Sequence, residues 1–251
     1  MTHKKTFQIG GIHLDKHKIS ALSPIIDAGV PELVYIPVRQ HIGAPAVLQK
    51  TKGDKVKIGT LLAAADGVVS ADVHSSVAGE IVKIEEMPGS SGYQELTVVI
   101  KTAPDEFETG IDTGSDIVKE ITASREEIIS AIRKAGIVGM GGAGYPTPIK
   151  TELPENKKAD CLIVNAIECE PYLTADGALM LEKAEQIIIG AKIINKALGI
   201  QNAVIAIDEN KPQAIEKLTK ISKSYIGVNV RVCKSKYPQG GERQLINAIT
   251  G

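Results

Sequence analysis

Hydrophobic residues change their spacing about halfway along the chain. Between residues 30 and 101, apolar positions form short runs, such as residues 33–38 and 96–100, and no helical period appears. Turn-forming residues separate these runs, and the pair Asp66-Gly67 favours a tight hairpin turn. This part of the sequence therefore predicts an all-β fold of short strands.

A polar segment at residues 102–123 reads as a linker, and beyond it the pattern becomes helical. Ser124 and Glu127 form a capping box that predicts the start of a helix, and Gly136 fits the position just after its end. We expect further strands at residues 161–164, 203–207 and 228–232, and helices at residues 177–198, 211–222 and 241–249. Buried strands that alternate with helices predict a parallel α/β domain over residues 124–251.

Two glycine turns of the β half, at residues 53–59 and 76–81, repeat one pattern. Two such hairpins resemble the barrel-sandwich hybrid of biotinyl and lipoyl domains, which carry a cofactor on a lysine at a hairpin tip. The corresponding position here is Val68, beside the Asp66-Gly67 turn. We therefore expect a structural or docking module, and not a swinging-arm carrier.

Composition narrows the class of protein. The chain has 251 residues, of which 43% are hydrophobic and 24% charged, as in a globular protein. Its net charge of −1 argues against a nucleic-acid binder. No apolar run is long enough to span a bilayer. The three cysteines lack CxxC spacing, so we expect neither a disulfide framework nor a metal site built by this chain alone. Free thiols also indicate a reducing compartment.

The richest local signal is a glycine loop at residues 139–144, which satisfies the pattern GxGxxG. A helix precedes it and Pro146 and Pro148 follow, so a Rossmann fingerprint fits poorly. Four glycines would still let backbone N–H groups approach a phosphate or a flat ring. A tight turn that packs a helix against a sheet is the alternative, and the loop alone does not separate the two.

Two more polar clusters follow predicted strands. Residues 165–172 carry an amide and two carboxylates, and residues 237–244 carry glycines and charges before a helix. In open α/β sheets, ligands bind outside the carboxyl ends of the strands. Asn165 can donate and accept hydrogen bonds, as the edge of a flavin requires. Helix capping and solvated charge are the alternative, but together with the glycine loop these clusters predict one shared crevice.

These segments resemble a known family. The sequences GMGGAGYPTPIK (139–150), NAIECEPYLTAD (165–176) and YPQGGERQLINAITG (237–251) are similar to the RnfC family and, more distantly, to the 51 kDa flavin subunit of respiratory complex I. In the first half, GGIH, PVRQHIGAPA and VHSSVAGEIVKIE extend the resemblance. It implies a barrel-sandwich hybrid domain over residues 1–101, a linker at 102–123, and an FMN/NADH-binding α/β domain from residue 124 that is truncated at its C-terminal end.

The resemblance also implies an FMN site on which NAD(H) stacks. Lys150 would lie towards the flavin phosphate or ring, and Asn165 and Glu168 would face the isoalloxazine. Tyr145 would stand where the complex I subunit has a Phe beside the nicotinamide. We expect no catalytic side chain and no metal ligand, because the cofactor carries the redox chemistry. The residues expected to bind the cofactors are Gly139, Gly141, Gly142, Gly144, Tyr145, Lys150, Asn165, Glu168, Cys169, Glu170, Gly240 and Glu242.

Four positions depart from the complex I pattern: Met140, Ile167, Cys169 and Gly241 replace Arg, Asp, Ser and Glu. These changes predict fewer polar contacts to FMN. Members of the family continue into segments with cysteine clusters for iron–sulfur ([4Fe-4S]) centres. We therefore expect this chain to be a fragment, a truncated gene product or a divergent short paralogue.

The function implied is electron transfer between NAD(H) and FMN or iron–sulfur centres, within an ion-translocating NAD:ferredoxin oxidoreductase. Its partners would be other Rnf-type subunits, NAD(H) and, indirectly, a ferredoxin-like carrier, with no nucleic acid. The chain would lie in the cytoplasm, held on the inner face of the membrane by those subunits. The alternatives are a non-catalytic docking module and a soluble electron-transfer partner of an amino-acid reductase.

Overall fold

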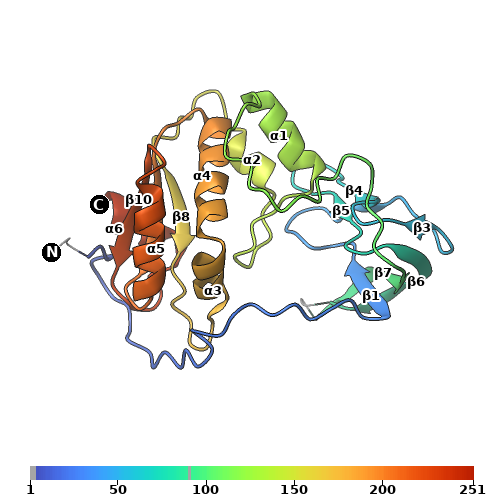
Figure 1. Cartoon of the computed structure of the whole chain (residues 1–251), viewed down its shortest axis with the longest axis horizontal. Coiled ribbons are helices and arrows are strands. Elements are labelled where there is room, and N and C mark those ends of the chain that lie inside the picture. The colour runs from blue at the N-terminus through green and yellow to red at the C-terminus, as the bar shows by residue number, and fades with distance from the viewer. Residues whose placement is uncertain (1–3, 90–91) are drawn as a thin grey trace. The chain divides into compact units, whose positions relative to one another are not determined.

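The computed structural model describes residues 4–89 and 92–251, which form two compact units (Figure 1). Residues 4–27, 117–125 and 155–251 make up one, called here the α/β unit. Residues 28–116 and 126–154, apart from 90 and 91, make up the other, the β unit. Each unit is therefore built from segments that are not contiguous in the sequence. The sequence predicts a single division, with a linker at residues 102–123.

Two antiparallel sheets form the β unit. The strand order is β1-β7-β6-β3 in one sheet and β2-β4-β5 in the other. No strand is long except the β6–β7 pair, which agrees with the short apolar runs of this half. The strands are β1 (Leu33–Pro37), β2 (Val47–Leu48), β3 (Lys55–Val56), β4 (Leu61–Ala64), β5 (Val73–His74), β6 (Gly79–Pro88) and β7 (Gln94–Thr102).

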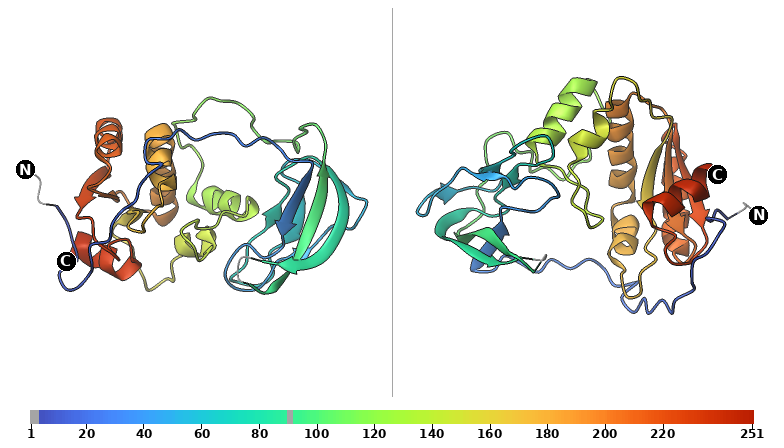
Figure 2. Two further views of the ribbon diagram at one scale, coloured as in Figure 1. Left: turned by 90° about the horizontal axis from the view of Figure 1, so that it is seen from below. Right: turned by 180° about the vertical axis from the view of Figure 1, so that it is seen from behind.

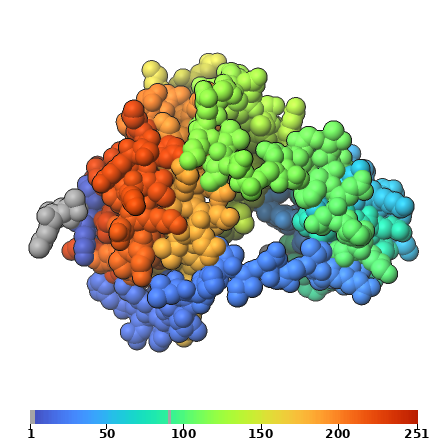
Figure 3. All heavy atoms as spheres, viewed as in Figure 1, coloured from blue at the N-terminus to red at the C-terminus, as the bar shows by residue number. Residues whose placement is uncertain are grey.

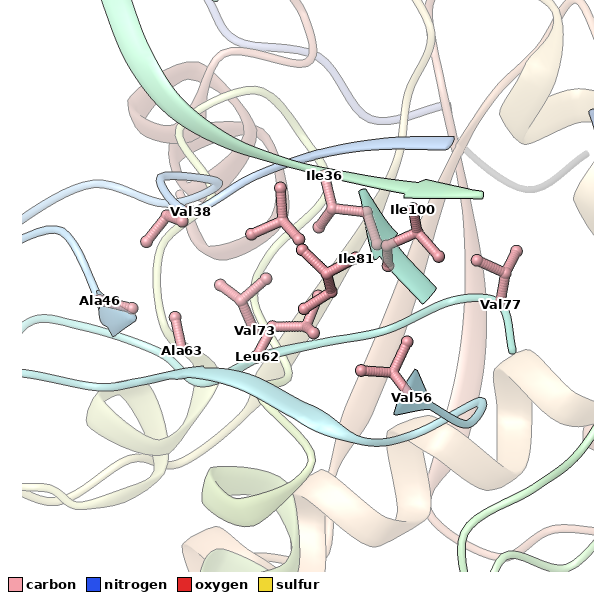
Figure 4. Packing of buried hydrophobic residues seen from close by; sticks show 11 residues of the cluster. Ile36, Val38, Ala46, Val56, Leu62, Ala63, Val73, Val77, Ile81 and Ile100 are labelled. Atoms are coloured by element: carbon pink, nitrogen blue, oxygen red, sulfur yellow. The ribbon is translucent and has the colours of Figure 1, made fainter. Parts of the chain in front are cut away.

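An aliphatic core fills the space between these sheets (Figure 4). Ile81 and Ile100 come from the four-stranded sheet, Leu62 and Val73 from the other, and all four side chains are buried. Removing such branched side chains from water is the main force that stabilises a small β unit without tryptophan.

The connection between β4 and β5 is longer than the tight hairpin expected at Asp66-Gly67. It covers residues 65–72, and Gly67 takes a positive φ of +89°. The Ala65 N–H donates to Asp72 Oδ1 at 2.8 Å, and the Asp66 N–H donates to Ser70 Oγ at 3.0 Å. Side-chain acceptors therefore shape this loop in place of a two-residue turn.

Helices α1 (Arg125–Lys134) and α2 (Thr147–Thr151) flank the glycine loop. Helix α1 begins directly after Ser124, as the capping box predicts. Gly136 has a φ of +63°, and the next N–H, of Ile137, donates to the Ile132 carbonyl at 3.1 Å, which closes the helix end as expected. A Cβ at Gly136 would lie 2.1 Å from the Asp72 carbonyl oxygen, so only glycine fits there.

A parallel sheet with strand order β10-β9-β8 forms the centre of the α/β unit. Its strands and helices lie within a few residues of the predicted positions. They are β8 (Leu162–Ala166), α3 (Ala175–Glu182), α4 (Ala184–Leu198), β9 (Ala203–Asp208), α5 (Pro212–Ser222), β10 (Val228–Cys233) and α6 (Glu242–Thr250).

Helices cover both faces of this sheet. Ile205 and Ile207 of β9 pack in the cluster that contains α4 and α5, whereas Ala206 packs with Leu245 of α6. Because successive side chains of a strand point to opposite faces, α6 must lie opposite to α4 and α5. The view from behind shows this arrangement (Figure 2).

The helix expected at residues 177–198 is divided into α3 and α4. Lys183 separates them with a φ of −120° and a ψ of 27°, outside the helical region. Lys217 of α5 donates its Nζ to the Leu181 carbonyl near the end of α3. No glycine or proline marks this break, so the apolar periodicity alone could not locate it.

Candidate functional site

Three polar segments follow the three strands of the parallel sheet. Residues 165–174, called here the acidic turn, include the last two residues of β8; residues 208–211 begin at the last residue of β9; and residues 237–241, the second turn, come after β10. Since the strands are parallel, their carboxyl ends meet at one edge of the sheet, where ligands of open α/β sheets bind.

Asn165 connects the acidic turn to the second turn. Its Nδ2 donates to the Gly240 carbonyl at 2.9 Å, and its Oδ1 accepts from the Ile167 N–H at 3.2 Å. A Cβ at Gly240 would lie 3.0 Å from the Ile167 carbonyl oxygen, tighter than ordinary contact. The structure thus brings two of the three predicted segments together, and glycine is the residue that allows it.

The carboxylate of Glu168 is buried, with a relative exposure of only 4%. Its Oε1 accepts from the Asp176 N–H at 2.9 Å, at the start of α3. Its Oε2 lies 3.1 Å from Nζ of Lys211, a side chain that is 10% exposed, although the pair lacks hydrogen-bond geometry. Glu168 is therefore a fixed, ion-paired group and not a solvated loop charge.

Sequence reasoning missed Lys211 and Lys18. Lys211 could have been found, because Asp208-Glu209-Asn210-Lys211 is a polar run after a strand like the other two. Lys18 lies far away in the sequence, yet its Nζ donates to the carbonyls of residues 168, 170 and 173 at 2.9, 2.9 and 2.5 Å. Burial and the nearby Lys211 charge lower the pKa of Lys18. No pattern in the sequence predicts this contact.

The remaining predicted residues of the α/β unit differ in exposure. Glu170 and Glu242 are exposed, and Glu242 is the first residue of α6. Cys169 is half-buried, and burial raises the pKa of its thiol, an effect opposed by a hydrogen bond from the Gly240 backbone. Cys169 and Ile167 both belong to the apolar cluster under α6. Two of the four departures from the complex I pattern therefore serve packing.

The glycine loop belongs to the β unit and is closed at its base. The Gly139 N–H donates to the Tyr145 carbonyl at 2.8 Å, and the Thr147 N–H donates to the Ile137 carbonyl at 3.0 Å. At the tip, Gly142 has a φ of +116°, and no heavy atom lies within 4 Å of where its Cβ would be. The tip is an open stretch of backbone.

Residues 40–42 support this loop. A Cβ at Gly144 would lie 2.8 Å from the Gln40 carbonyl oxygen, and the Ile42 N–H donates to the Gly144 carbonyl at 3.4 Å. Tyr145 and Lys150 also meet, with Lys150 Nζ 5.4 Å from the centre of the tyrosine ring, a cation–π distance. Lys150 is otherwise exposed, so its charge is available to a ligand.

A small pocket of about 60 Å³ lies beside the acidic turn, lined among others by Lys18, Glu168 and Lys211. A larger one, of about 560 Å³, lies near the amino ends of the strands, lined among others by Lys192 and Lys196. Those two lysines donate to the backbone carbonyls of residues 226 and 121. The carboxyl edge remains the better candidate, because that is where the polar groups converge.

Residues 4–89 and 92–251 contain no group of three His, Cys, Asp or Glu side chains that could hold a metal ion. Within the same residues, no helix is long and apolar enough to cross a membrane. Cys161, Cys169 and Cys233 are free thiols.

Comparison with protein families gives two matches in sequence order. Residues 5–105 match the RnfC barrel sandwich hybrid domain, and residues 132–251 match the Nuo51 FMN-binding domain. Both parts of the expected fold class are thereby confirmed: a barrel-sandwich hybrid followed by an α/β domain of the complex I flavin-subunit type.

Curated relatives resemble the chain along nearly its whole length. A subunit of the proton-translocating ferredoxin:NAD(+) oxidoreductase complex of Clostridium ljungdahlii is 44% identical, over 98% of this chain and 53% of the relative. The corresponding subunit of the Na(+)-translocating complex of Acetobacterium woodii is 41% identical, over 96% of this chain and 54% of the relative. The chain thus spans about half the length of these relatives.

Among solved structures, an NAD+-reducing [NiFe]-hydrogenase is similar over 50% of this chain and 24% of its own, with 26% identity and a TM-score of 0.45. The two domain matches and the curated relatives agree with each other along the chain. The chain is therefore a relative of the RnfC-type subunits of ferredoxin:NAD(+) oxidoreductase complexes, with their barrel-sandwich hybrid domain and a Nuo51-type FMN-binding domain.

Proposed function

We propose that this chain binds FMN and transfers electrons between NAD(H) and one-electron carriers, as part of an ion-translocating NAD:ferredoxin oxidoreductase. The observation that supports this best is the Asn165–Gly240 hydrogen bond, which draws two polar turns together at the carboxyl edge of the sheet. The names of the relatives, as components of ferredoxin:NAD(+) oxidoreductases, favour the same chemistry.

The residues of the α/β unit fit a flavin. Asn165 uses one N–H and one lone pair of its amide inside the protein, so one of each remains for the flavin edge. Its side chain is exposed, and the buried Glu168 lies three residues on with a fixed carboxylate. We assign the orientation of the ring to these two residues, with Cys169, Glu170, Gly240 and Glu242 around them.

The glycine loop of the β unit fits a phosphate or a flat ring. Gly141 and Gly142 leave backbone N–H groups unobstructed by side chains, and a positive φ at Gly142 excludes most other residues. Lys150 carries an available positive charge on the same unit. We assign Lys150 and the backbone of Gly139, Gly141, Gly142 and Gly144 to FMN contacts, and Tyr145 to the nicotinamide side.

Bound FMN supplies hydride exchange with NAD(H) and release of single electrons. The protein's part is binding, orientation and exclusion of water. In the acidic turn, the departures at Ile167 and Cys169 pack under α6, and they leave the Asn165 and Glu168 groups in place.

Partners and location follow from the same proposal. Electrons would pass to [4Fe-4S] centres outside this chain and on to a ferredoxin-like carrier. Other Rnf-type subunits would hold the chain at the cytoplasmic face of the membrane. A docking role for the β unit is the second candidate, favoured by Val68, which is 81% exposed at the position where a carrier domain has its lysine.

An anaerobic reduction experiment tests the proposal. The purified chain is incubated with FMN, freed of unbound flavin, and mixed with NADH while flavin absorbance is followed. We expect NADH to bleach the bound flavin. A chain that retains FMN but is not bleached would remove NAD(H) from the proposal, and a chain that stays colourless would favour the docking role.

A further inference from the structure

A segment close to the N-terminus lies along the acidic turn within the α/β unit. We call residues 16–25 the N-terminal strap; in the space-filling view the blue N-terminal part of the chain lies along the lower edge of this unit (Figure 3). The Tyr172 N–H donates to the Lys16 carbonyl at 3.0 Å, and Ser20 Oγ lies 2.8 Å from Thr174 Oγ1. The Ile25 N–H donates to Glu182 Oε1 at 2.7 Å, which fixes the far end of the strap on α3.

Lys18 is the centre of this contact. An ammonium group has three N–H donors, and all three are directed at backbone carbonyls of the acidic turn, those of residues 168, 170 and 173. Hydrogen bonds from a charged donor are worth roughly twice those between neutral groups. One side chain therefore ties three carbonyls of the turn, from residue 168 to residue 173, to a single point.

The acidic turn needs such support, because its backbone is strained. Tyr172 has a φ of +67°, a left-handed conformation that is uncommon for a residue with a large side chain. Such a conformation persists only where the surroundings fix it. The strap supplies a second contact here, since the His17 and Tyr172 rings stack with centroids 5.1 Å apart and planes 12° apart.

We infer that Lys18 is a positioning residue for the flavin site: the strap holds the acidic turn in the shape that presents Asn165 and Glu168. This inference rests on the proposed FMN binding. It adds that part of the flavin affinity is set by a segment outside the matched FMN-binding domain, which begins at residue 132. Loss of the Lys18 contacts should loosen the turn locally and weaken FMN binding, without unfolding the chain.

The test compares Lys18→Met with Lys16→Met in the full chain. Both variants remove one lysine charge from the strap, but only the first removes the three bonds to the turn. Hydrogen exchange of the peptide spanning residues 165–176 reports the turn, and titration with FMN reports affinity. The visible circular dichroism of the bound flavin, at saturating FMN, reports how the ring is held.

For Lys18→Met we expect faster exchange in that peptide, at least tenfold weaker FMN binding and an altered flavin dichroism. Lys16→Met should match wild type in all three. Equal affinity and dichroism in Lys18→Met and wild type would overturn the inference, whether or not exchange changes. If the wild-type chain itself binds no FMN, the proposed function is wrong. That outcome is distinct from a failure of the Lys18 inference, in which the wild-type chain does bind FMN.

A second variant covers the case in which Lys18→Met does not fold. His17→Ala removes the ring stack but keeps every bond of Lys18. We expect a smaller rise in exchange of the same peptide and a severalfold loss of FMN affinity. Unchanged exchange and affinity in His17→Ala would contradict a positioning role for the strap.

Discussion

Asn165 Nδ2 donates to the carbonyl of Gly240 at 2.9 Å, and so ties the end of one strand to the turn after another. Strand β9 lies between β8 and β10, so this bond bridges across the central strand at the edge of the sheet. The sequence predicts that Asn165 faces the flavin. In the structure its side-chain amide also connects the acidic turn to the second turn.

Replacing Asn165 by Ala should separate the two turns. We expect a loss of about 0.5–1.5 kcal/mol in unfolding free energy, the usual worth of a hydrogen bond, and a clear loss of FMN affinity. Asn229→Ala is the matched control, because Asn229 is an exposed amide on β10. Chemical denaturation and FMN titration measure both effects. Equal FMN affinity in Asn165→Ala and wild type would argue against the assigned role.

The buried Glu168–Lys211 pair should respond differently to single and double replacements. Lys211→Met leaves the Glu168 carboxylate buried without its counter-charge, and such a loss costs about 3–5 kcal/mol. Glu168→Gln combined with Lys211→Met removes both charges and should recover most of that stability. A double-mutant cycle in denaturant gives the coupling energy. Additive effects of the two changes would show that the pair is not coupled.

Alkaline stability should depend on Cys233. Burial, with the nearby Asp208 charge, raises the pKa of this thiol from 9.0 to about 11. The unfolded chain therefore loses the proton first, so stability falls as pH rises from 9 towards 11. A shift of this size corresponds to about 3 kcal/mol. The difference in unfolding free energy between wild type and Cys233→Ala should change across that window, and a constant difference would contradict the assignment.

Much of the fold could be predicted because its signals are local. Strands β8, β9 and β10 are short apolar runs, and Gly136 marks a helix end by its own backbone freedom. The break at Lys183 could not be predicted, because no glycine or proline marks it and the apolar spacing continues across it. The spacing of apolar residues predicts a single helix or strand, but it does not predict the contacts that the element makes with other elements.

The candidate site shows the same limit. Asn165 and Glu168 could be proposed as site residues because polar residues after a buried strand point to a sheet edge, and the structure shows that Asn165 contacts the turn at Gly240. Lys18 was missed because its three bonds go to backbone carbonyls, which carry no side-chain signature in the sequence. Gly144 was assigned to a ligand, and the structure adds that it also lets the loop pack on residues 40 and 41.

Lys150 provides a test of the glycine loop. If its charge neutralises the flavin phosphate, Lys150→Ala should weaken FMN binding by about 1–3 kcal/mol, the worth of a charge-assisted contact. Lys134→Ala is the control, since Lys134 is an exposed lysine of the same unit at the end of α1. Flavin fluorescence titration compares the two. An affinity unchanged by Lys150→Ala would remove this residue from the site.

The most direct measurement is an equilibrium titration of the purified chain with FMN and, in parallel, with riboflavin. The proposed binding of a phosphorylated flavin predicts saturable binding of one FMN per chain. It also predicts markedly weaker binding of riboflavin, which has the ring but not the phosphate. Absence of saturable FMN binding, or equal affinity for the two flavins, would contradict the account.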